Sequence, residues 1–423
     1  MSTEDIIQRD LGLCSNILSG KNHFTETQNN VVRQYMLALL TFIPPEYLSG
    51  YTNPCWYTDF ETQNLLNRSL EPRIVANLPR LEQLYSKQEV LQVLDEIAHR
   101  RKDKLITGEG QLFCLPSVFL AGFPKCATTA FYEMLTSHPA IATPRSKEVH
   151  FWSVFSKTKD YIYEAFQSLH YLYHFSPAGE KILLNPKTIT LDASPDTILD
   201  IATTNSSLDS DICIVPTIIS TLLPEAKYIV LMRNPVDRLW SAYWYFCIEQ
   251  QWKRKGHGVN IPDTYMHHGP EAFHNHAVDP INEYLGCLHS NSTEFECARR
   301  DPPAINDTCI CSAGSLTVGL YYLHLVKWLS VVPKQQFLFL RAEDLASHPR
   351  EVMHKVWKFL TLDPPADADL KISHANRNTW MRRHKKFKLL PLTQHLLSSF
   401  YHPYNRRLAT LLKDDSFLWT DYP

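Results

Sequence analysis

Lys125, Thr128 and Thr129 lie within one short segment, residues 122–129, and their side chains together could bind an anion. The lysine carries a positive charge, and the two threonines carry hydroxyl donors. The apolar run at 118–121 predicts a buried strand before the segment, and the apolar spacing after it predicts a helix. Because the first N–H groups of a helix attract anions, this order predicts a site for a phosphate-sized group.

The segment differs from the phosphate loop of nucleoside triphosphatases. That pattern needs Gly at 127 and Lys-Ser/Thr at 128 and 129, where this chain has Ala127, Thr128 and Thr129. No ligand set for magnesium is apparent further along the sequence. We therefore expect a phosphorylated ligand that binds without a required metal.

Arg233 and Ser241 form a second candidate site. Residues 228–232 are predicted to form a buried strand, and the Asn-Pro pair at 234–235 suits the N-cap and first position of a helix. The arginine would emerge at the carboxyl end of the strand and the serine two turns into the helix. A guanidinium there can grip a phosphate with two parallel hydrogen bonds. The alternative is an ion pair between Arg233 and Asp237.

Glu148 and His150 are the candidate general bases. They lie in residues 144–152, Pro-Arg-Ser-Lys-Glu-Val-His-Phe-Trp, which could return from the loop helix to the edge of the sheet where α/β proteins bind ligands. The apolar neighbours would exclude water and raise the pKa of the glutamate, which suits it to accept a proton from a hydroxyl group. His150 is the rival base.

The two anion motifs resemble those of the sulfotransferases. Residues 124–129, Pro-Lys-Cys-Ala-Thr-Thr, are similar to the 5′-phosphosulfate loop of this family, Pro-Lys-x-Gly-Thr-Thr, and Arg-x7-Ser at 233–241 is similar to its 3′-phosphate site. Ala127 replaces the usual Gly and would strain the loop by about 1 kcal/mol if the position needs a positive φ. The resemblance implies that 3′-phosphoadenosine 5′-phosphosulfate (PAPS) binds to Lys125, Cys126, Ala127, Thr128, Thr129, Arg233 and Ser241.

The Glu-Val-His-Phe pattern resembles that of the heparan sulfate sulfotransferases and implies that Glu148 is the base. These enzymes carry a functional lysine where this chain has Ala193, so that contribution is absent or has moved, with Lys187 as the candidate. Two acidic residues nearby, Asp192 and Asp196, are predicted to be turn and capping groups.

Basic side chains have two further predicted roles. Lys125 is expected to offset the negative charge that develops on the bridging and leaving oxygens of the donor. Arg382 and Arg383 lie in a basic run at 377–386. We expect that one of them closes over the 3′-phosphate of the donor or contacts an anionic glycan, and the alternative is a solvated surface.

Later segments, at 318–323, 340–345, 353–360 and 400–405, look most like carbohydrate sulfotransferases that modify the 6-hydroxyl of N-acetylgalactosamine 4-sulfate in chondroitin and dermatan sulfate. The resemblance implies a sulfated glycosaminoglycan as acceptor and desulfated PAPS (PAP) as product. Three alternatives remain: another glycan O-sulfotransferase, for example of the heparan type, a non-catalytic glycan-binding relative, and a kinase-like phosphotransferase that uses ATP and magnesium.

The order of elements predicts an α/β fold with a central parallel sheet flanked by helices, and the resemblance implies the P-loop-like sulfotransferase fold. We expect a helical N-terminal collar at 1–110, with helices at 31–42 and 81–99, and a sulfotransferase domain at 111–423. A Cys-rich insertion at about 251–315 is expected to help form the acceptor cleft. The predicted core elements that follow it are a helix at 316–331, a strand at 336–340 and a helix at 351–360.

The composition is that of a globular protein. Of the 423 residues, 44% are hydrophobic and 20% are charged, and the formal net charge is −2. Nucleic-acid binding is not expected, because it needs a strongly basic face. The best candidate for a membrane span, residues 35–43, has about half of the ~20 residues that are required.

Cysteines and glycosylation sequons indicate the secretory pathway, with the Golgi lumen as the expected location. Four of the 10 cysteines crowd between 287 and 311, where disulfides are favoured over a zinc site because Cys309-x-Cys311 lacks the usual Cys-x2-Cys spacing. The N-terminus does not look like a signal peptide, so either a membrane anchor lies outside this sequence or the protein is not in the secretory pathway. The four sequons are at Asn67, Asn205, Asn291 and Asn306.

Overall fold

The computed structural model describes most of the predicted catalytic domain and three short parts of the region before it. The described residues are 2–11, 43, 46–58, 111–154, 168, 170–199, 213–249, 269–299, 316–365 and 387–420. Several predictions lie outside the described residues: the helices at 31–42 and 81–99, Arg382 and Arg383, Cys309 and Cys311, and the sequons at Asn67, Asn205 and Asn306.

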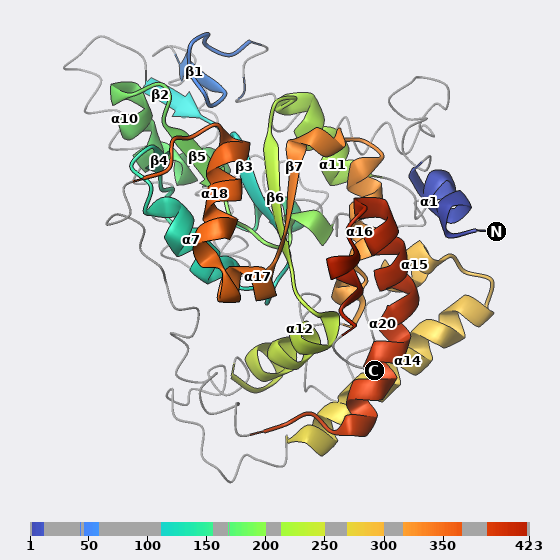
Figure 1. Cartoon of the computed structure of the whole chain (residues 1–423). Coiled ribbons are helices and arrows are strands. Elements are labelled where there is room, and N and C mark those ends of the chain that lie inside the picture. Colours follow the sequence, from blue (N-terminus) through green and yellow to red (C-terminus); the bar gives the residue numbers. More distant parts are fainter. Residues whose placement is uncertain are drawn as a thin grey trace, which may run out of the picture.

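Five parallel strands form the central sheet, with helices flanking it (Figure 1). Their order across the sheet is β4 (Ile141–Ala142), β5 (Ile189–Asp192), β3 (Val118–Gly122), β6 (Lys227–Met232) and β7 (Phe337–Arg341). The predicted fold class, α/β with a central parallel sheet, is therefore confirmed.

The middle of the sheet is buried because its strands are apolar on both faces. All five residues of β3 are buried, and so are the last five of β6. Such continuous apolar runs are typical of parallel strands that are covered by helices on both sides. Aromatic rings cross from strand to strand in this core: Phe119 stacks on Tyr228 with 5.5 Å between ring centroids, and Tyr228 stacks on Phe337 with 4.9 Å.

The path of the chain reverses direction around β3. From β3 it runs through α7 (Thr128–Thr136) to the edge strand β4 and returns to β5, beside β3. It then continues through α11 (Ile214–Leu222) to β6 on the other side of β3. The loops that follow β3, β5 and β6 therefore meet at one edge, at a switch point of the kind where open α/β sheets bind their ligands.

The remaining elements agree with the predicted core, with shifts of one or a few residues. The predicted helix at 316–331 is a short 3-10 turn, Leu316–Gly319, followed by α16 (Tyr321–Leu329), and α18 begins at Pro349. The other helices of the domain are α8 (Phe151–Val154), α10 (Ser176–Leu184), α12 (Pro235–Ala242), α17 (Ala342–Ser347), α18 (Pro349–Leu360) and α20 (Pro391–Leu412). Short 3-10 turns lie at Thr197–Leu199, Lys334–Gln336 and Asp415–Leu418, and a π-helical segment at Tyr243–Glu249.

The predicted Cys-rich insertion contains two helices, α14 (Pro270–His289) and α15 (Glu294–Arg299), which lie beside α20 (Figure 1). Buried Phe273, Ala277, Ile281 and Tyr284 follow one another at helical spacing along α14. The sequence analysis did not predict this helix, because polar residues separate the apolar ones and Pro280 lies within the helix. Cys287 and Cys297 form a disulfide, which confirms the disulfide interpretation for this pair.

The described parts of the N-terminal region pack on the catalytic domain. Helix α1 (Thr3–Leu11) lies against α16 and α20, and buried Asp10 accepts a hydrogen bond of 2.7 Å from the hydroxyl of Tyr322. Strand β1 (Cys55–Thr58) pairs antiparallel with β2 (Gln111–Cys114), and a disulfide joins Cys55 to Cys114. A domain boundary near residue 110 stays a prediction. Within the described ranges, no helix combines the length and apolar character that a membrane crossing requires.

Candidate active site

The predicted phosphosulfate loop connects β3 to α7, and two of its residues adopt left-handed backbone conformations. Lys125 has φ 69° and Ala127 has φ 63°. Ala127 is the N-cap residue of α7, and its methyl group cannot cap the helix. The condition under which alanine strains the loop, a positive φ at position 127, is therefore met. Because the residue is alanine, the N–H groups at the start of α7 keep their affinity for an anion.

The side chains of this loop point in different directions. Lys125 places its Nζ 3.7 Å from the ring centroid of Tyr245, which belongs to the π-helical segment. Thr128 is buried and Thr129 exposed at the start of α7. Cys126 is fully buried, and burial raises the pKa of its thiol to about 11. Cys126 can therefore not offer a ligand a thiolate, and its backbone N–H donates a hydrogen bond of 3.2 Å to the carbonyl of Phe123.

Arg233 emerges at the carboxyl end of β6, as predicted. The Asn234 side chain caps α12 by accepting a hydrogen bond of 3.0 Å from the N–H of Val236. The guanidinium of Arg233 lies 4.0 Å from the carboxylate of Asp237, and both side chains are about 30% exposed. This long contact is the alternative ion pair expected from the sequence, and it leaves the guanidinium accessible. Ser241 is buried on α12.

Tyr321, at the start of α16, contacts both anion motifs. Its hydroxyl donates a hydrogen bond of 2.7 Å to the backbone carbonyl of Arg233 and lies 3.6 Å from the sulfur of Cys126. The two motifs therefore lie beside one another across one buried phenol group. Sequence reasoning assigned no site role to Tyr321, because it is 88 residues from Arg233 and 195 from Cys126.

Glu148 lies within a chain of four charged groups. Its Oε1 forms an ion pair with Nζ of Lys147, and its Oε2 lies 3.2 Å from Nε2 of His150. The other ring nitrogen of His150 lies 2.9 Å from the carboxylate of Asp196. Asp196 was predicted to be a turn or capping group, and the structure adds its contact with the ring of His150 to that prediction.

The surroundings of Glu148 lower the pKa of its carboxyl, contrary to the prediction. Burial raises the pKa, but the hydrogen bond from His150 and the charge of Lys147 outweigh it and bring the pKa to about 2. The aromatic residues that were expected to surround the carboxylate, Phe151 and Trp152, are buried in the core instead. Glu148 is therefore ionised at neutral pH and can accept a proton.

His150 has the opposite behaviour. Burial lowers the pKa of its ring, but the hydrogen bonds to Asp196 and Glu148 outweigh this effect and raise the pKa to about 10. The ring is then protonated at neutral pH and has no free lone pair to receive a proton. Of the two candidate bases, Glu148 has the protonation state that a base requires.

A buried network holds the segment that carries both candidate bases. The hydroxyl of Ser194 accepts hydrogen bonds from the N–H groups of Val149 (3.1 Å) and His150 (3.0 Å) and donates one of 2.6 Å to Asp192. Asp192 also accepts from the N–H of Ser194 and from the hydroxyl of Tyr171. Asp192 is thus a turn group, as predicted, and it also supports this segment through Ser194.

Comparison with known proteins identifies the family. The family model of the sulfotransferase domain matches residues 115–395, about two thirds of the chain. The chain belongs to the sulfotransferase family. The predicted resemblance and the assignment as an enzyme are confirmed by this match.

This sulfotransferase is 29% identical to human carbohydrate sulfotransferase 15 over 416 residues, which cover 92% of this chain and 68% of the human protein. It is 24% identical to the bovine bifunctional heparan sulfate N-deacetylase/N-sulfotransferase 2 over 251 residues, 59% of this chain and 22% of the bovine protein. A crystal structure of a sulfotransferase from Alicyclobacillus acidocaldarius aligns with a TM-score of 0.42 and 18% identity, covering 71% of this chain and 97% of that one.

The lysine beside Glu148 in this sulfotransferase is Lys147 and not Lys187. Lys187 precedes β5 and lies at the amino end of that strand, whereas Ala193 and the base segment lie at its carboxyl end. The Nζ of Lys147 is 3.3 Å from the hydroxyl of Thr128 and pairs with Glu148. The prediction that Lys187 takes the missing lysine's place is therefore wrong.

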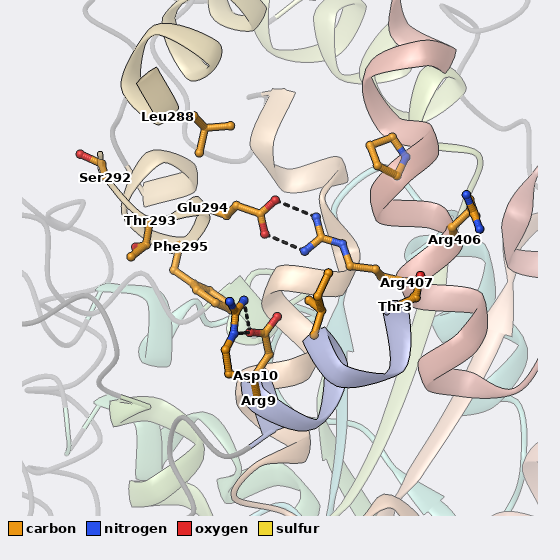
Figure 2. A pocket seen from close by; sticks show the side chains of 12 residues that line it. Thr3, Arg9, Asp10, Leu288, Ser292, Thr293, Glu294, Phe295, Arg406 and Arg407 are labelled. Atoms are coloured by element: carbon orange, nitrogen blue, oxygen red, sulfur yellow. Dashed lines mark hydrogen bonds and ion pairs between the residues drawn. The ribbon is translucent and has the colours of Figure 1, made fainter. Parts of the chain in front are cut away.

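A cavity of about 740 Å³ lies apart from these residues, between α1, the α14–α15 turn and α20 (Figure 2). Its lining includes none of the sequence-predicted site residues. Arg406 and Arg407 contribute to its wall, and Arg407 pairs with Glu294 across it. Among the residues that the structure describes, no three His, Cys, Asp or Glu side chains are grouped as metal ligands.

Proposed function

We propose that this sulfotransferase transfers the sulfuryl group of PAPS to a hydroxyl group of a sulfated glycosaminoglycan. The observation that carries the proposal is the meeting of two anion motifs at the carboxyl ends of adjacent strands, β3 and β6, with the ionised Glu148 beside the start of α7. The two motifs match the two phosphorylated ends of one donor molecule.

The proposed donor contacts follow from these positions. Lys125, Thr128, Thr129 and the N–H groups of 127–129 hold the 5′-phosphosulfate, where the uncapped start of α7 favours negative charge. Arg233 and Ser241 hold the 3′-phosphate, and Arg382 or Arg383 is proposed to close over it or to contact the glycan.

In the proposed reaction, the acceptor oxygen forms a bond to sulfur while the bond from sulfur to the bridging oxygen of the 5′-phosphate breaks. The hydroxyl proton passes to Glu148, and the electron pair of the broken bond leaves with PAP. Lys125 offsets the negative charge that gathers on the leaving oxygen, a preorganised effect often worth several kcal/mol.

For the acceptor we propose the 6-hydroxyl of N-acetylgalactosamine 4-sulfate in chondroitin or dermatan sulfate. The support is the similarity to human carbohydrate sulfotransferase 15 over most of both chains. A heparan-type acceptor is the alternative, which the similarity to the N-sulfotransferases favours.

We also propose that the protein works in the lumen of the secretory pathway, in the Golgi. The disulfides Cys55–Cys114 and Cys287–Cys297 support an oxidising compartment.

The test is incubation of the purified protein with radiolabelled PAPS and separate chondroitin, dermatan and heparan chains, followed by disaccharide analysis. We expect label on N-acetylgalactosamine 4-sulfate and undiminished transfer in the presence of EDTA. In a parallel thermal-shift titration, PAP should stabilise the protein and ATP with magnesium should not. Glycan binding without any transfer would instead establish a non-catalytic relative.

A further inference from the structure

Lys147 contacts both the candidate base and the start of α7. Its Nζ pairs with Oε1 of Glu148 and lies 3.3 Å from the hydroxyl of Thr128. Only 15% of the Lys147 side chain is exposed. An ammonium group held there lies between the place where the sulfuryl group of the donor would bind and the group that would receive the proton.

The charges around Glu148 work against its proposed role as a base. Two cationic groups, Lys147 and His150, face the carboxylate, and together they stabilise its ionised form. A carboxylate that is stabilised so strongly is a poor acceptor for the proton of a hydroxyl group. At least one of these contacts has to weaken before the proton can transfer.

The two cationic groups differ in their freedom to move. The ring of His150 is fixed on its other side by Asp196 at 2.9 Å, and the backbone N–H of His150 donates a hydrogen bond to the hydroxyl of Ser194. Lys147 ends in a flexible four-carbon chain, and its second contact is the hydroxyl of Thr128, toward the proposed donor. A small rotation of this chain would move the ammonium from the carboxylate toward the loop.

We propose that Lys147 exchanges Glu148 for the sulfuryl oxygens when PAPS binds, so that the base becomes able to accept a proton only once the donor is in place. This inference rests on the proposed function. During transfer the ammonium group donates hydrogen bonds to the sulfuryl oxygens and keeps its own protons. The hydroxyl proton goes to Glu148, sulfur gains the acceptor oxygen, and the bridging oxygen leaves with PAP. Lys147 thereby couples donor binding to activation of the base.

The substitution Lys147→Met removes the ammonium group and keeps a chain of similar length. We expect kcat to fall about 100-fold, as is typical when one preorganised donor to a transition state is lost. The affinity for PAP should stay within about twofold of wild type, because PAP lacks the sulfuryl group. Lys147→Arg should restore part of kcat, and Lys187→Met, at the far end of β5, should match wild type.

The pH profile gives a readout that a merely structural role would not change. Glu148 is faced by Lys147 and His150, with Asp196 behind the ring. Without Lys147 the pKa of Glu148 rises toward its ordinary range, and the acid limb of kcat/KM should therefore move to higher pH.

Two results would overturn this inference while leaving the proposed function intact. One is a Lys147→Met enzyme with nearly wild-type kcat and an unmoved acid limb. The other is a loss of PAP affinity that matches the loss of kcat, together with a loss of thermal stability, which would make Lys147 a structural residue. Absence of PAPS-dependent transfer by the wild-type protein would instead overturn the proposed function, and this inference with it.

Discussion

Glu148 and His150 stand two residues apart and touch each other, yet their neighbours give them opposite charges. Lys147 lies on one side of the glutamate, whereas Asp196 lies on the far side of the histidine. The carboxylate is thus ionised far below neutral pH, and the ring keeps its proton to about pH 10. Either residue alone would have been a plausible base. Their different protonation states follow from their neighbours, which are the cation Lys147 beside Glu148 and the anion Asp196 beside His150.

Glu148→Gln should therefore abolish turnover and leave donor binding nearly unchanged. General bases contribute typically 10²–10⁴-fold to a rate, and an amide cannot accept the proton. The measurement is kcat with saturating PAPS, together with the affinity for PAP by calorimetry. His150→Gln is the matched comparison: if it stops turnover while Glu148→Gln keeps wild-type kcat, the base is the histidine.

Ala127→Gly should stabilise the protein, because alanine is held at φ 63° where glycine has no steric penalty. The expected gain is up to about 1 kcal/mol in the free energy of unfolding, measured by urea denaturation with PAP binding retained. Ala130→Gly is the control, since it lies inside α7 and should cost about 1 kcal/mol. Equal losses for both variants would contradict the interpretation of strain at 127.

At the scale of elements, the active site depends on how the carboxyl end of β5 supports the segment after β4. One hydroxyl, that of Ser194, receives two backbone N–H groups of this segment and connects them to buried Asp192. Glu148 has the backbone of its neighbours fixed in this way, so its position is set by β5 rather than by its own short loop.

Ser194→Ala should reduce kcat by about 10-fold or more while the affinity for PAP is kept, because the proposed donor contacts follow β3 and β6 and not β5. The free energy of unfolding should also fall by roughly 1 kcal/mol, because two partly buried N–H groups lose their acceptor. Ser220→Ala removes a hydroxyl that donates only to the carbonyl of Thr217 on α11 and should preserve kcat. Loss of PAP affinity equal to the loss of kcat would show that Ser194 supports the whole site.

The two anion motifs could be predicted from the sequence because each is local. In each motif, one continuous segment contains a strand, a loop and the start of a helix, and this order determines where Lys125 and Arg233 lie. The structure places both residues after the ends of their predicted strands. The contacts of Ser194 and Tyr321 could not be predicted, since they join residues 44–45 and 88–195 positions apart. Lys147 is next to Glu148 in the sequence, but its contact with Thr128 depends on the fold. The lowered pKa of Glu148 was missed for the same reason.

At the scale of the whole molecule, α16 connects the donor motifs to the outer helices. Its consecutive residues Tyr321 and Tyr322 point to different partners: the first contacts the loop of Cys126 and Arg233, and the second donates to Asp10 of α1. The ring of Tyr322 also lies 4.9 Å from the guanidinium carbon of Arg407 on α20. The first turn of α16 is therefore fixed from both sides, and α1, α15 and α20 help to hold it.

The ion pair between Glu294 and Arg407 joins α15 to α20 at this place (Figure 2). Both guanidinium nitrogens donate to the carboxylate, at 2.6 and 2.7 Å, and the arginine side chain is only 10% exposed. Glu294→Gln leaves that buried charge without its partner. We expect the free energy of unfolding to fall by about 2 kcal/mol, less than for a fully buried pair because Glu294 is partly exposed.

Chemical denaturation measures this loss. The matched control is Glu283→Gln, because Glu283 lies on the exposed face of α14. This substitution should change the free energy of unfolding by no more than about 0.5 kcal/mol. Because the pair lies on the outer helices and touches neither anion motif, kcat measured well below the melting temperature should stay near wild type. A Glu294→Gln enzyme that is as stable as wild type would mean that the contact of Tyr284 on α14 with Tyr404 on α20, and the apolar contacts around it, hold these outer helices together without the ion pair. A stable enzyme with a lowered kcat would mean that α16 transmits the state of this pair to the donor site.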